Sequence, residues 1–420
     1  MASMNASLEK LLQDNLRELA REEGLAPEDI DTRIRDGRMV LLGNPAHAGC
    51  TPTLIGQPAG LKVNANIGTS PFHNDPELEA SKLQTAQEAG AHTVMDLSTG
   101  GELDAIRKRM LRETRLPLGT VPLYSVAQKY ILAEEDPACM SRSEILEEVA
   151  LEAEQGVDFM TLHCGVTRRA IALAREEGRR LGVVSRGGSL LARWMEQNDA
   201  ENPLLTDYDA LLRVCCEHNV TLSLGDGLRP GAIEDAGDGA QWEEVITLGE
   251  LARRANESGA QAMIEGPGHV PLHLIQSQIQ GMKTICGGAP LYVLGPLTTD
   301  TAAGHDHIAG TVGATLAAYY GADFLCYLTP AEHLTLPNEN DVWQGVKASL
   351  VAADSAEVSL GRKAALDRNR NIAKARADLD WSGMAEHCLD PRLMRKRRQG
   401  FDSKKECAMC GEFCAVRLFG

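Results

Sequence analysis

The sequence predicts an α/β fold: a (β/α)8 TIM-type barrel with a small N-terminal cap and a C-terminal helical segment that ends in a flexible tail. From Lys62 to Leu328, short apolar runs alternate with helical segments, as in a parallel sheet covered by helices. Polar residues follow the ends of the runs, where barrels place their functional side chains. A doubly wound open sheet is the alternative, but its Gly-rich fingerprint is absent, because NIGTSP does not match G-x-G-x-x-G.

The chain divides into four predicted segments: an N-terminal helical cap (1–60), the barrel (61–336), C-terminal helices (337–392) and a flexible tail (393–420). In the cap, leucines recur at helical spacing: Leu8, Leu11, Leu12, Leu16 and Leu19. Gly24 ends this helix, and Pro27 allows a second one to begin. The basic run at residues 395–398 is interpreted as the start of the flexible tail.

Nine apolar runs resemble strands, whereas a closed barrel needs eight, so one run lies outside the barrel or is not a strand. They are KVNAN, HTVMDL, LGTVPL, DFMTLH, GVVSR, VTLSLG, QAMIEG, LYVLG and DFLCYL. Polar residues stand at or just after the ends of eight runs: Asn66, Asp96, Tyr124, His163, Ser185, Asp226, Glu265 and Tyr292. We expect these side chains to converge at one mouth of the barrel.

Composition excludes several classes of protein. The 42 Lys and Arg residues against 59 Asp and Glu give a net charge of -17, which disfavours nucleic acid and anionic membranes as partners. No run approaches about 20 apolar residues, and the N-terminus lacks the features of a signal peptide, so we expect a cytoplasmic protein. Eight of the 11 cysteines are scattered and are interpreted as reduced core residues, Cys326 among them.

The other three cysteines form a dense cluster at the C-terminus. Cys407, Cys410 and Cys414 make a C-x2-C-x3-C motif within ECAMCGEFC. Structural zinc needs a fourth ligand, and the nearest candidates, His387 and Cys388, lie about twenty residues upstream. Three thiolates on a 4Fe-4S cluster leave one iron without a protein ligand, whereas an electron carrier normally has a fourth cysteine. The open iron can chelate S-adenosylmethionine.

Histidines offer a second metal site. His269 in EGPGHVP and His333 in PAEHL are one candidate pair, and His305 and His307 in GHDHI are another. Each histidine alone is more often a structural residue than a ligand. Spacing does not choose between the two pairs.

Long motifs carry a resemblance to a known family. They are KVNANIGTS, HTVMDLSTG, LGTVPLY, TLHCGV, VSRGGS, SLGDGLRPGAIEDA, MIEGPGHVP, LGPLTTD and FLCYLTPAEHL, with the cysteine cluster. From about Lys62 to Cys414 the chain resembles the phosphomethylpyrimidine synthase (thiamine pyrimidine synthase) family and its paralogue, 5-hydroxybenzimidazole synthase. The resemblance implies a radical S-adenosylmethionine carbon–carbon lyase of EC 4.1.99 type that acts on aminoimidazole ribotide. It also implies a 4Fe-4S cluster, zinc or another divalent metal, a flavodoxin- or ferredoxin-type electron donor and a homodimer.

The resemblance also implies site residues. The family's substrate contacts fall on Asn66, Met95, Tyr124, His163, Ser185, Arg186, Gly187, Asp226, Gly227, Leu228, Arg229, Glu265 and Tyr292. Glu265 and Tyr292 are the candidate catalytic residues. The family's metal falls on His269 and His333, which returns His305 and His307 to a structural role, and its iron–sulfur cluster falls on Cys407, Cys410 and Cys414.

The two relatives differ in their product. Departures from compact thiamine synthases around the barrel favour 5-hydroxybenzimidazole, a cobalamin precursor. They include NASLEKLLQDNLRELAREEG near the start and Ser355 near a family histidine. The alternative product is the hydroxymethylpyrimidine phosphate of thiamine biosynthesis.

Two other classes of function are more distant. A zinc-dependent barrel hydrolase would use His269, His333, Asp226 and Glu265, but it leaves the cysteine cluster unexplained. An iron–sulfur sensor without enzymatic activity leaves the polar strand ends unexplained.

Overall fold

The computed structural model describes residues 4–401 and 403–419. Its strands are β1 (Val40–Leu42), β2 (Thr53–Ile55), β3 (Lys62–Ile67), β4 (Thr93–Asp96), β5 (Leu118–Thr120), β6 (Phe159–Leu162), β7 (Thr221–Leu224), β8 (Ala262–Glu265), β9 (Leu291–Leu294) and β10 (Phe324–Cys326). Its main helices are α1 (Ala6–Glu23), α2 (Pro27–Arg35), α3 (Pro76–Ala89), α4 (Leu103–Glu113), α5 (Pro122–Leu132), α6 (Arg142–Gln155), α7 (Arg168–Glu176), α8 (Arg186–Asn198), α9 (Pro203–Thr206), α10 (Tyr208–His218), α11 (Gly239–Ser258), α12 (Ile275–Ile285), α13 (Asp306–Tyr319), α14 (Glu339–Ser359), α15 (Lys363–Ala377), α16 (Trp381–His387), α17 (Pro391–Arg398) and α18 (Ala415–Phe419). The short 3-10 helices are η1 (Pro137–Cys139), η2 (Ile233–Asp235), η3 (Leu272–Leu274) and η4 (Gly411–Phe413).

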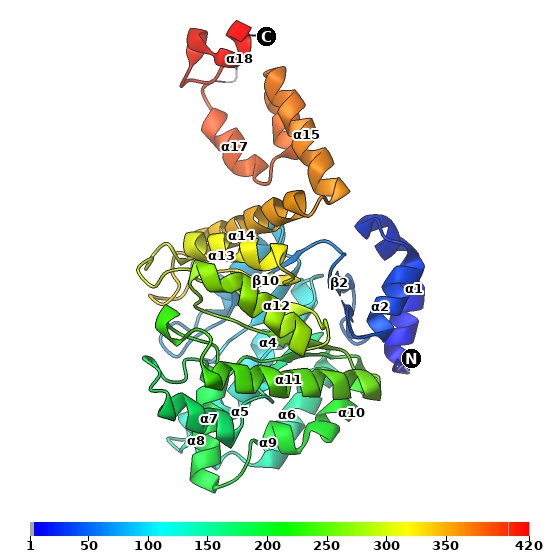
Figure 1. Cartoon of the computed structure of the whole chain (residues 1–420), viewed down its shortest axis with the longest axis vertical. Helices are drawn as coiled ribbons and strands as arrows, with labels where there is room; N and C mark the ends of the chain where they lie inside the picture. The colour runs from blue at the N-terminus through cyan, green and yellow to red at the C-terminus, as the bar shows by residue number, and fades with distance from the viewer. Residues whose placement is uncertain (1–3, 402, 420) are drawn as a thin grey trace. The chain divides into compact units, whose positions relative to one another are not determined.

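The predicted TIM-type barrel is confirmed. Eight parallel strands close in the order β10-β3-β4-β5-β6-β7-β8-β9, with helices around them (Figure 1). The register sets Asn66 opposite Met95 and Glu265 opposite Tyr292. Because all strands run the same way, their carboxyl ends open at one mouth.

One of the nine predicted strands, GVVSR at residues 182–186, is not a strand. Strands β6 and β7 pair directly, with Phe159 opposite Thr221, which leaves no edge for another strand. The segment instead leads into α8, where the Ser185 side chain accepts the N–H of Gly188 at 3.2 Å. This helix-capping bond ends the β-like sequence Val183–Val184 before it can pair.

Aromatic rings fill the barrel beneath the mouth. Phe159 and Phe324 meet edge to face with ring centres 6.4 Å apart, and Tyr292 stacks on Phe324 at 4.2 Å. A Cβ at Gly119 in β5 would lie 2.3 Å from the Phe159 ring, so only glycine makes room for it. The interior is therefore a packed core rather than a pore.

The N-terminal cap contains the two predicted helices and an additional hairpin. The Asn5 side chain accepts the N–H of Leu8 at 2.8 Å and begins α1, while Gly24, with φ +66°, ends it. Strands β1 and β2 pair antiparallel. The sequence predicted a purely helical cap, so this hairpin was not expected. The buried core of the cap is formed by Leu8, Leu12, Leu19, Ala20, Ile30, Ile34, Met39, Leu41, Leu54 and Ala59.

The β1–β2 region covers the N-terminal end of the barrel. Polar residues that directly precede barrel strands bond to its backbone. Asp158 accepts the N–H of Asn44 at 2.7 Å, and Gln261 accepts that of Leu41 at 2.7 Å. Asp323 accepts the N–H of Gln57 at 2.7 Å. The cap thus closes the end of the barrel opposite the mouth.

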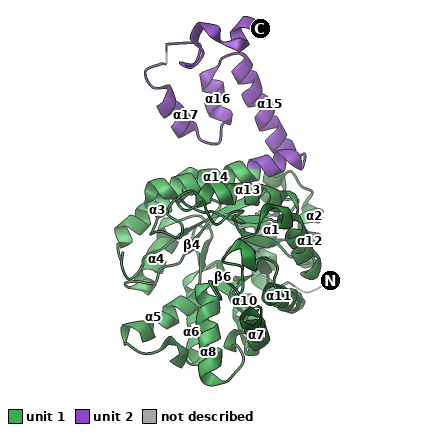
Figure 2. Cartoon of the chain, turned by 60° about the vertical axis from the view of Figure 1, so that its left-hand side comes forward, with its two compact units in different colours: residues 1–353 green, residues 354–420 purple. Residues whose placement is uncertain are grey.

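The chain divides into two compact units, residues 1–353 and 354–420 (Figure 2). In the second unit, the basic run at residues 395–398 lies in α17, which crosses the predicted boundary between the C-terminal helices and the tail. Arg398 stacks over the Trp381 ring at 4.0 Å and donates to the carbonyls of Phe401 at 2.6 Å and Lys404 at 2.8 Å. These contacts order the end of the basic run. In the described part of the chain, no helix is long and apolar enough to cross a membrane.

Candidate active site at the barrel mouth

A polar cavity opens at the carboxyl ends of the barrel strands. It is lined by Asn66, Met95, Leu97, Val121, Tyr124, Thr161, His163, Asp226, Arg229, Glu265, Gly266, Tyr292, Val293, Leu294 and Cys326. All eight barrel strands, or the residues just after them, contribute to this wall. Six of the eight strand-end residues predicted to converge line this cavity, and Asp96 and Ser185 do not.

Two carboxylates and one arginine form the charged centre of the cavity. Glu265 Oε1 accepts hydrogen bonds from Thr161 Oγ1 at 2.7 Å and from Ser223 Oγ at 2.5 Å. Asp226 accepts a hydrogen bond from Arg229 Nη1 at 2.9 Å, and burial raises the pKa of this aspartate. Burial, and next the charge of Asp226, raise the pKa of Glu265 to about 7. Glu265 can therefore accept or release a proton near neutral pH.

His163 presents a neutral imidazole to the cavity. Burial, and next the charge of Arg229, lower its pKa to about 3. Its Nε2 lies 3.1 Å from Ser185 Oγ, while its buried Nδ1 has no hydrogen-bond partner among the described residues. A Cβ at Gly187 would lie 2.2 Å from the His163 ring, so only glycine lets the start of α8 pass this close. The unpartnered Nδ1 lies against the start of α8, where a Cβ at Gly187 would come within 2.3 Å of it.

A hydrogen-bonded cluster on β3, β9 and β10 forms the opposite wall. Asn64 Nδ2 lies within hydrogen-bond distance of both Asn66 Oδ1 and Tyr292 Oη, at 2.7 Å each. Asn66 Nδ2 donates to Cys326 Sγ at 3.0 Å, and Tyr292 Oη lies 3.7 Å from Met95 Sδ. Cys326, interpreted from the sequence as a core residue without chemistry, is buried but lines the cavity.

Two turns meet beside this cavity. A Cβ at Gly188 would lie 2.4 Å from Gly227 O, so the start of α8 packs backbone to backbone against the turn at residues 226–229. Leu228 N–H donates to Glu244 Oε2 at 2.8 Å, and Arg179 Nη2 donates to Leu228 O at 2.6 Å. Glu244 and Arg179 therefore hold this turn from behind.

The structure places the predicted substrate contacts in two groups. Those that line the cavity are Asn66, Met95, Tyr124, His163, Asp226, Arg229, Glu265 and Tyr292. Those that lie in the two adjoining turns are Ser185, Arg186, Gly187, Gly227 and Leu228. Asp96, expected at the mouth as a strand-end residue, does not line the cavity, and its Oδ1 accepts the N–H of Ser98 at 2.9 Å.

Several polar residues of the site were not predicted from the sequence. They are Asn64, Thr161, Arg179, Ser223, Glu244 and Cys326. Asn64 and Thr161 stand two positions before Asn66 and His163, and alternation along a strand points such residues to the same side. This alternation could therefore have identified Asn64 and Thr161 from the sequence. Arg179 lies in the loop after α7 and Glu244 lies in α11, and no local pattern indicates them.

The structure brings His269 and His333 together. Their ring centres lie 5.4 Å apart with 45° between the planes. Two imidazoles on one tetrahedral zinc ion, at the usual Zn–N length, would place their ring centres roughly 5 Å apart, so the pair suits a shared metal. His333 also has φ +59°, an uncommon backbone conformation for a residue other than glycine. His305 and His307 lie at the start of α13 with ring centres 6.4 Å apart.

A second cavity adjoins the first. Asn66 and Leu97 line both, and the second also contains Arg186, Glu332 and His333. A candidate metal ligand thus lies beside the polar cavity rather than in a remote part of the barrel.

Two of the three clustered cysteines, Cys407 and Cys410, take part in hydrogen bonds. Backbone N–H groups of Cys410 and Met409 donate to the Cys407 sulfur and lower the pKa of that thiol. The Cys407 and Cys410 side chains are themselves hydrogen-bonded, which raises the pKa of Cys410. Hydrogen bonds to cysteine sulfurs are a common feature of iron–sulfur sites. The surroundings of Cys407 and Cys410 are therefore compatible with the predicted cluster, and all three cysteines are free thiols.

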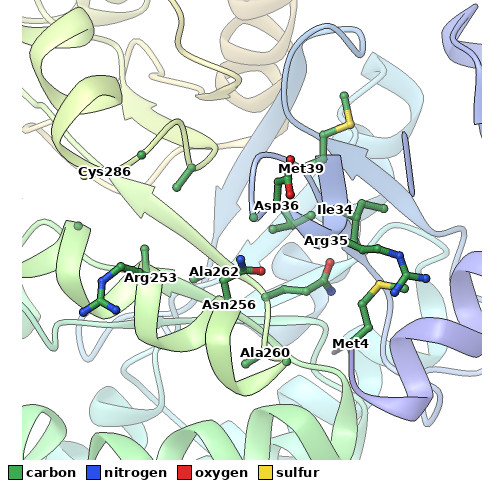
Figure 3. A pocket seen from close by; sticks show the side chains of 18 of the residues that line it. Met4, Ile34, Arg35, Asp36, Met39, Arg253, Asn256, Ala260, Ala262 and Cys286 are labelled. Carbon is green, nitrogen blue, oxygen red and sulfur yellow. The ribbon is translucent and has the colours of Figure 1, made fainter. Parts of the chain in front are cut away.

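A larger cavity lies at the other end of the barrel, about 190 Å³ against about 90 Å³ at the mouth. Figure 3 shows this cavity, whose lining includes Ile34 and Met39 of the cap and Ala262, which begins β8. Barrel enzymes carry their chemistry at the opposite end. We therefore place the active site at the smaller cavity at the mouth, which Asp226, Arg229 and Glu265 line.

A cluster of potential ligands near the cap is better explained by structure. Atoms of His47, Cys50 and Asp158 lie within 4.8 Å of one another. The Asp158 carboxylate already accepts the N–H groups of Asn44 and Leu118, both at 2.7 Å, and lies 2.7 Å from His47 Nδ1. Burial also raises the pKa of the Cys50 thiol, which disfavours the thiolate.

A closed parallel barrel with its charged residues at the C-terminal mouth, in a chain that also carries three closely spaced cysteines, defines a radical S-adenosylmethionine barrel enzyme as the class of protein. The chain belongs to the Radical SAM ThiC family, whose sequence model matches residues 2–420. It is 46% identical to the phosphomethylpyrimidine synthase of Methanopyrus kandleri over 97% of this chain and 96% of that protein. It is likewise 46% identical to that of Desulfitobacterium hafniense, over 100% and 97%, and 44% identical to that of Methanocaldococcus jannaschii, over 100% and 98%.

Proposed function

We propose that this protein converts aminoimidazole ribotide into hydroxymethylpyrimidine phosphate for thiamine biosynthesis. The observation that carries the proposal is the cavity at the mouth, where eight of the predicted substrate contacts meet. Near-full-length similarity to relatives named phosphomethylpyrimidine synthase supports this product.

The cavity offers complementary partners for the two halves of a ribotide. A phosphate would be bound by Arg229 and by the close-packed turns at residues 185–188 and 226–229, whose glycines let the backbone approach closely. An aminoimidazole ring would be bound by Asn66, Tyr124 and the His163 side chain, which all line the cavity. The Arg186 guanidinium carbon lies 4.7 Å from the centre of the Tyr124 ring, and this contact would orient the ring.

Glu265 is the residue that we assign to proton transfer. Its pKa of about 7 allows both protonation states under physiological conditions. Hydrogen bonds from Thr161 and Ser223 fix one oxygen of its carboxylate at the wall of the cavity. Tyr292, which the sequence gives as the other catalytic candidate, would orient the ring through its hydroxyl group.

Three groups that the resemblance implies have fitting residues. Cys407, Cys410 and Cys414 would hold the 4Fe-4S cluster, and His269 with His333 would hold zinc or another divalent metal. When bound, the cluster and S-adenosylmethionine supply the radical that removes hydrogen from the substrate. We assign S-adenosylmethionine to the second cavity, because this cavity adjoins the first and contains His333.

A second candidate product is 5-hydroxybenzimidazole, which the sequence departures favour. Those departures lie outside the lining of the mouth cavity, so this cavity does not discriminate between the two products. The relatives named above favour the pyrimidine. We also infer a homodimer and a flavodoxin- or ferredoxin-type electron donor from the family resemblance.

Complementation tests the proposed product in cells. The gene should restore growth to a bacterial strain that requires the thiamine pyrimidine, and the Cys410→Ala variant should not. Failure to rescue, despite soluble protein with an assembled cluster, would contradict the thiamine assignment. Accumulation of 5-hydroxybenzimidazole in the same cells would identify the second candidate.

A further inference from the structure

Both candidate metal-binding histidines face an aspartate from one short segment. His269 Nδ1 lies 2.7 Å from Asp300 Oδ1, and His333 Nδ1 lies 3.8 Å from Asp306 Oδ1. Asp300 lies in the loop after β9, and Asp306 begins α13. Residues 300–306 therefore reach both imidazoles, which themselves come from the loops after β8 and β10.

A carboxylate at Nδ1 determines which nitrogen of an imidazole can bind a metal. It accepts the Nδ1 proton and leaves the Nε2 lone pair free. Asp300 is itself fixed, because its Oδ2 accepts the N–H of Ile233 at 3.0 Å. His269 is thus held as the tautomer whose Nε2 can bind a cation.

Asp306 occupies the equivalent position at His333 but is not fully bonded. Its side chain is 6% exposed, and Oδ2 has no hydrogen-bond partner among the described residues. The 3.8 Å separation from His333 is longer than a hydrogen bond. An uncompensated buried carboxylate oxygen is costly. A cation between the histidines would offset this cost electrostatically.

We propose that Asp300 and Asp306 are positioning residues of the metal centre, one for each histidine. The inference rests on the proposed function, which places a divalent metal on His269 and His333. It adds that Asp300 sets the tautomer of His269, while Asp306 places a buried carboxylate 3.8 Å from His333 Nδ1. Metal affinity should therefore depend on side chains that do not touch the metal.

A purely structural role for Asp300 predicts a different outcome. If the aspartate only fastens its loop to Ile233, an asparagine can still accept that N–H through its amide oxygen. The asparagine amide nitrogen would then face His269 and donate to Nδ1, which moves the imidazole proton to Nε2 and removes the metal-binding lone pair. Asp300→Asn thus separates loop fastening from control of the tautomer.

The test measures zinc affinity in the full chain with its iron–sulfur cluster assembled. Zinc is titrated in competition with a chromophoric chelator, and iron is counted separately. Asp300→Asn and Asp306→Asn should each weaken zinc binding by about 10- to 100-fold. Both should also reduce the rise in thermal midpoint that zinc produces in the wild type.

Asp136→Asn is the matched control. Asp136 is an ion-paired aspartate whose side chain is 30% exposed, close to the 37% of Asp300. Its variant should bind zinc like the wild type. Asp300→Asn lowers the thermal midpoint of metal-free protein more than this control does if the substitution also destabilises the fold. In that case the zinc affinity of Asp306→Asn decides the test.

His269→Ala distinguishes failure of this inference from failure of the proposed metal site. Loss of zinc in His269→Ala with unchanged affinity in both aspartate variants would overturn the positioning role and leave the metal site in place. A full equivalent of zinc in His269→Ala would overturn the metal site itself.

Discussion

The two ends of the barrel differ in how completely their buried polar groups are hydrogen-bonded. At the N-terminal end, Asp158 and Gln261 form hydrogen bonds with the backbone of the cap, and Asp158 also accepts the N–H of Leu118 in β5. At the mouth, His163 Nδ1, Glu244 Oε1 and Asp306 Oδ2 are buried without partners among the described residues. Satisfied groups stabilise a fold, whereas buried groups without a partner require another explanation, such as a functional role. The larger cavity lies at the satisfied end, so size alone would misplace the active site.

The largest expected effect is on the cysteine cluster. Cys410→Ala should abolish turnover and leave the thermal midpoint unchanged, because this exposed side chain contributes a cofactor ligand and no core burial. Cys139→Ala, which removes another exposed thiol, is the control and should retain full activity. Iron and sulfide content after anaerobic purification reports the cluster directly. An active Cys410→Ala enzyme would disprove the assignment.

At the mouth, Glu265→Gln should lower kcat by about 10²- to 10⁴-fold, the usual contribution of a proton-transfer group. Wild-type activity should change through about pH 7, where this carboxyl titrates, and the variant should lose that step. The pH–rate profile measures both. A Gln variant with the wild-type profile would show that Glu265 does not transfer the proton.

Glu265 should also make stability depend on pH. Because its folded pKa is raised to about 7, the folded state binds more protons than the unfolded state between the ordinary glutamate value and pH 7. Stability should therefore fall as the pH rises through this window, and the slope should be smaller in Glu265→Gln. Denaturant unfolding at several pH values measures it, and an unchanged slope would contradict the assigned pKa.

At the other end, Asp158→Ala should lower the free energy of unfolding by about 3–5 kcal/mol, because it leaves two backbone N–H groups and His47 without their shared acceptor. The protein that remains folded should keep its wild-type kcat. Urea unfolding and turnover per folded molecule check the two halves. A large loss of kcat in folded Asp158→Ala would remove the distinction between the two ends.

The smallest effect concerns the turn at residues 226–229. Glu244→Ala removes the acceptor of the Leu228 N–H and should raise KM about tenfold with little change in kcat, since the turn binds the ligand and does not react. Glu244→Gln keeps an acceptor oxygen and should restore KM. If both variants change kcat and leave KM unchanged, Glu244 has another role.

The sequence predicted the barrel because apolar runs with helices between them have few other solutions. It overcounted the strands at GVVSR, since a local run cannot show that β6 and β7 already pair. It missed the β1–β2 hairpin, whose strands are only three residues long. Residues at strand ends, such as His163 and Glu265, were predictable from position. Arg179, Glu244, Asp300 and Asp306 act through three-dimensional contacts that local sequence patterns do not show.

The most direct test of the central claim identifies the product formed at the mouth. Reconstituted protein is incubated anaerobically with aminoimidazole ribotide, S-adenosylmethionine and a strong reductant, and the product is compared by mass and chromatography with both standards. We expect hydroxymethylpyrimidine phosphate from the wild type and from Asp136→Asn, and none from Glu265→Gln over the same time. A 5-hydroxybenzimidazole product, or full product from Glu265→Gln, would contradict the account.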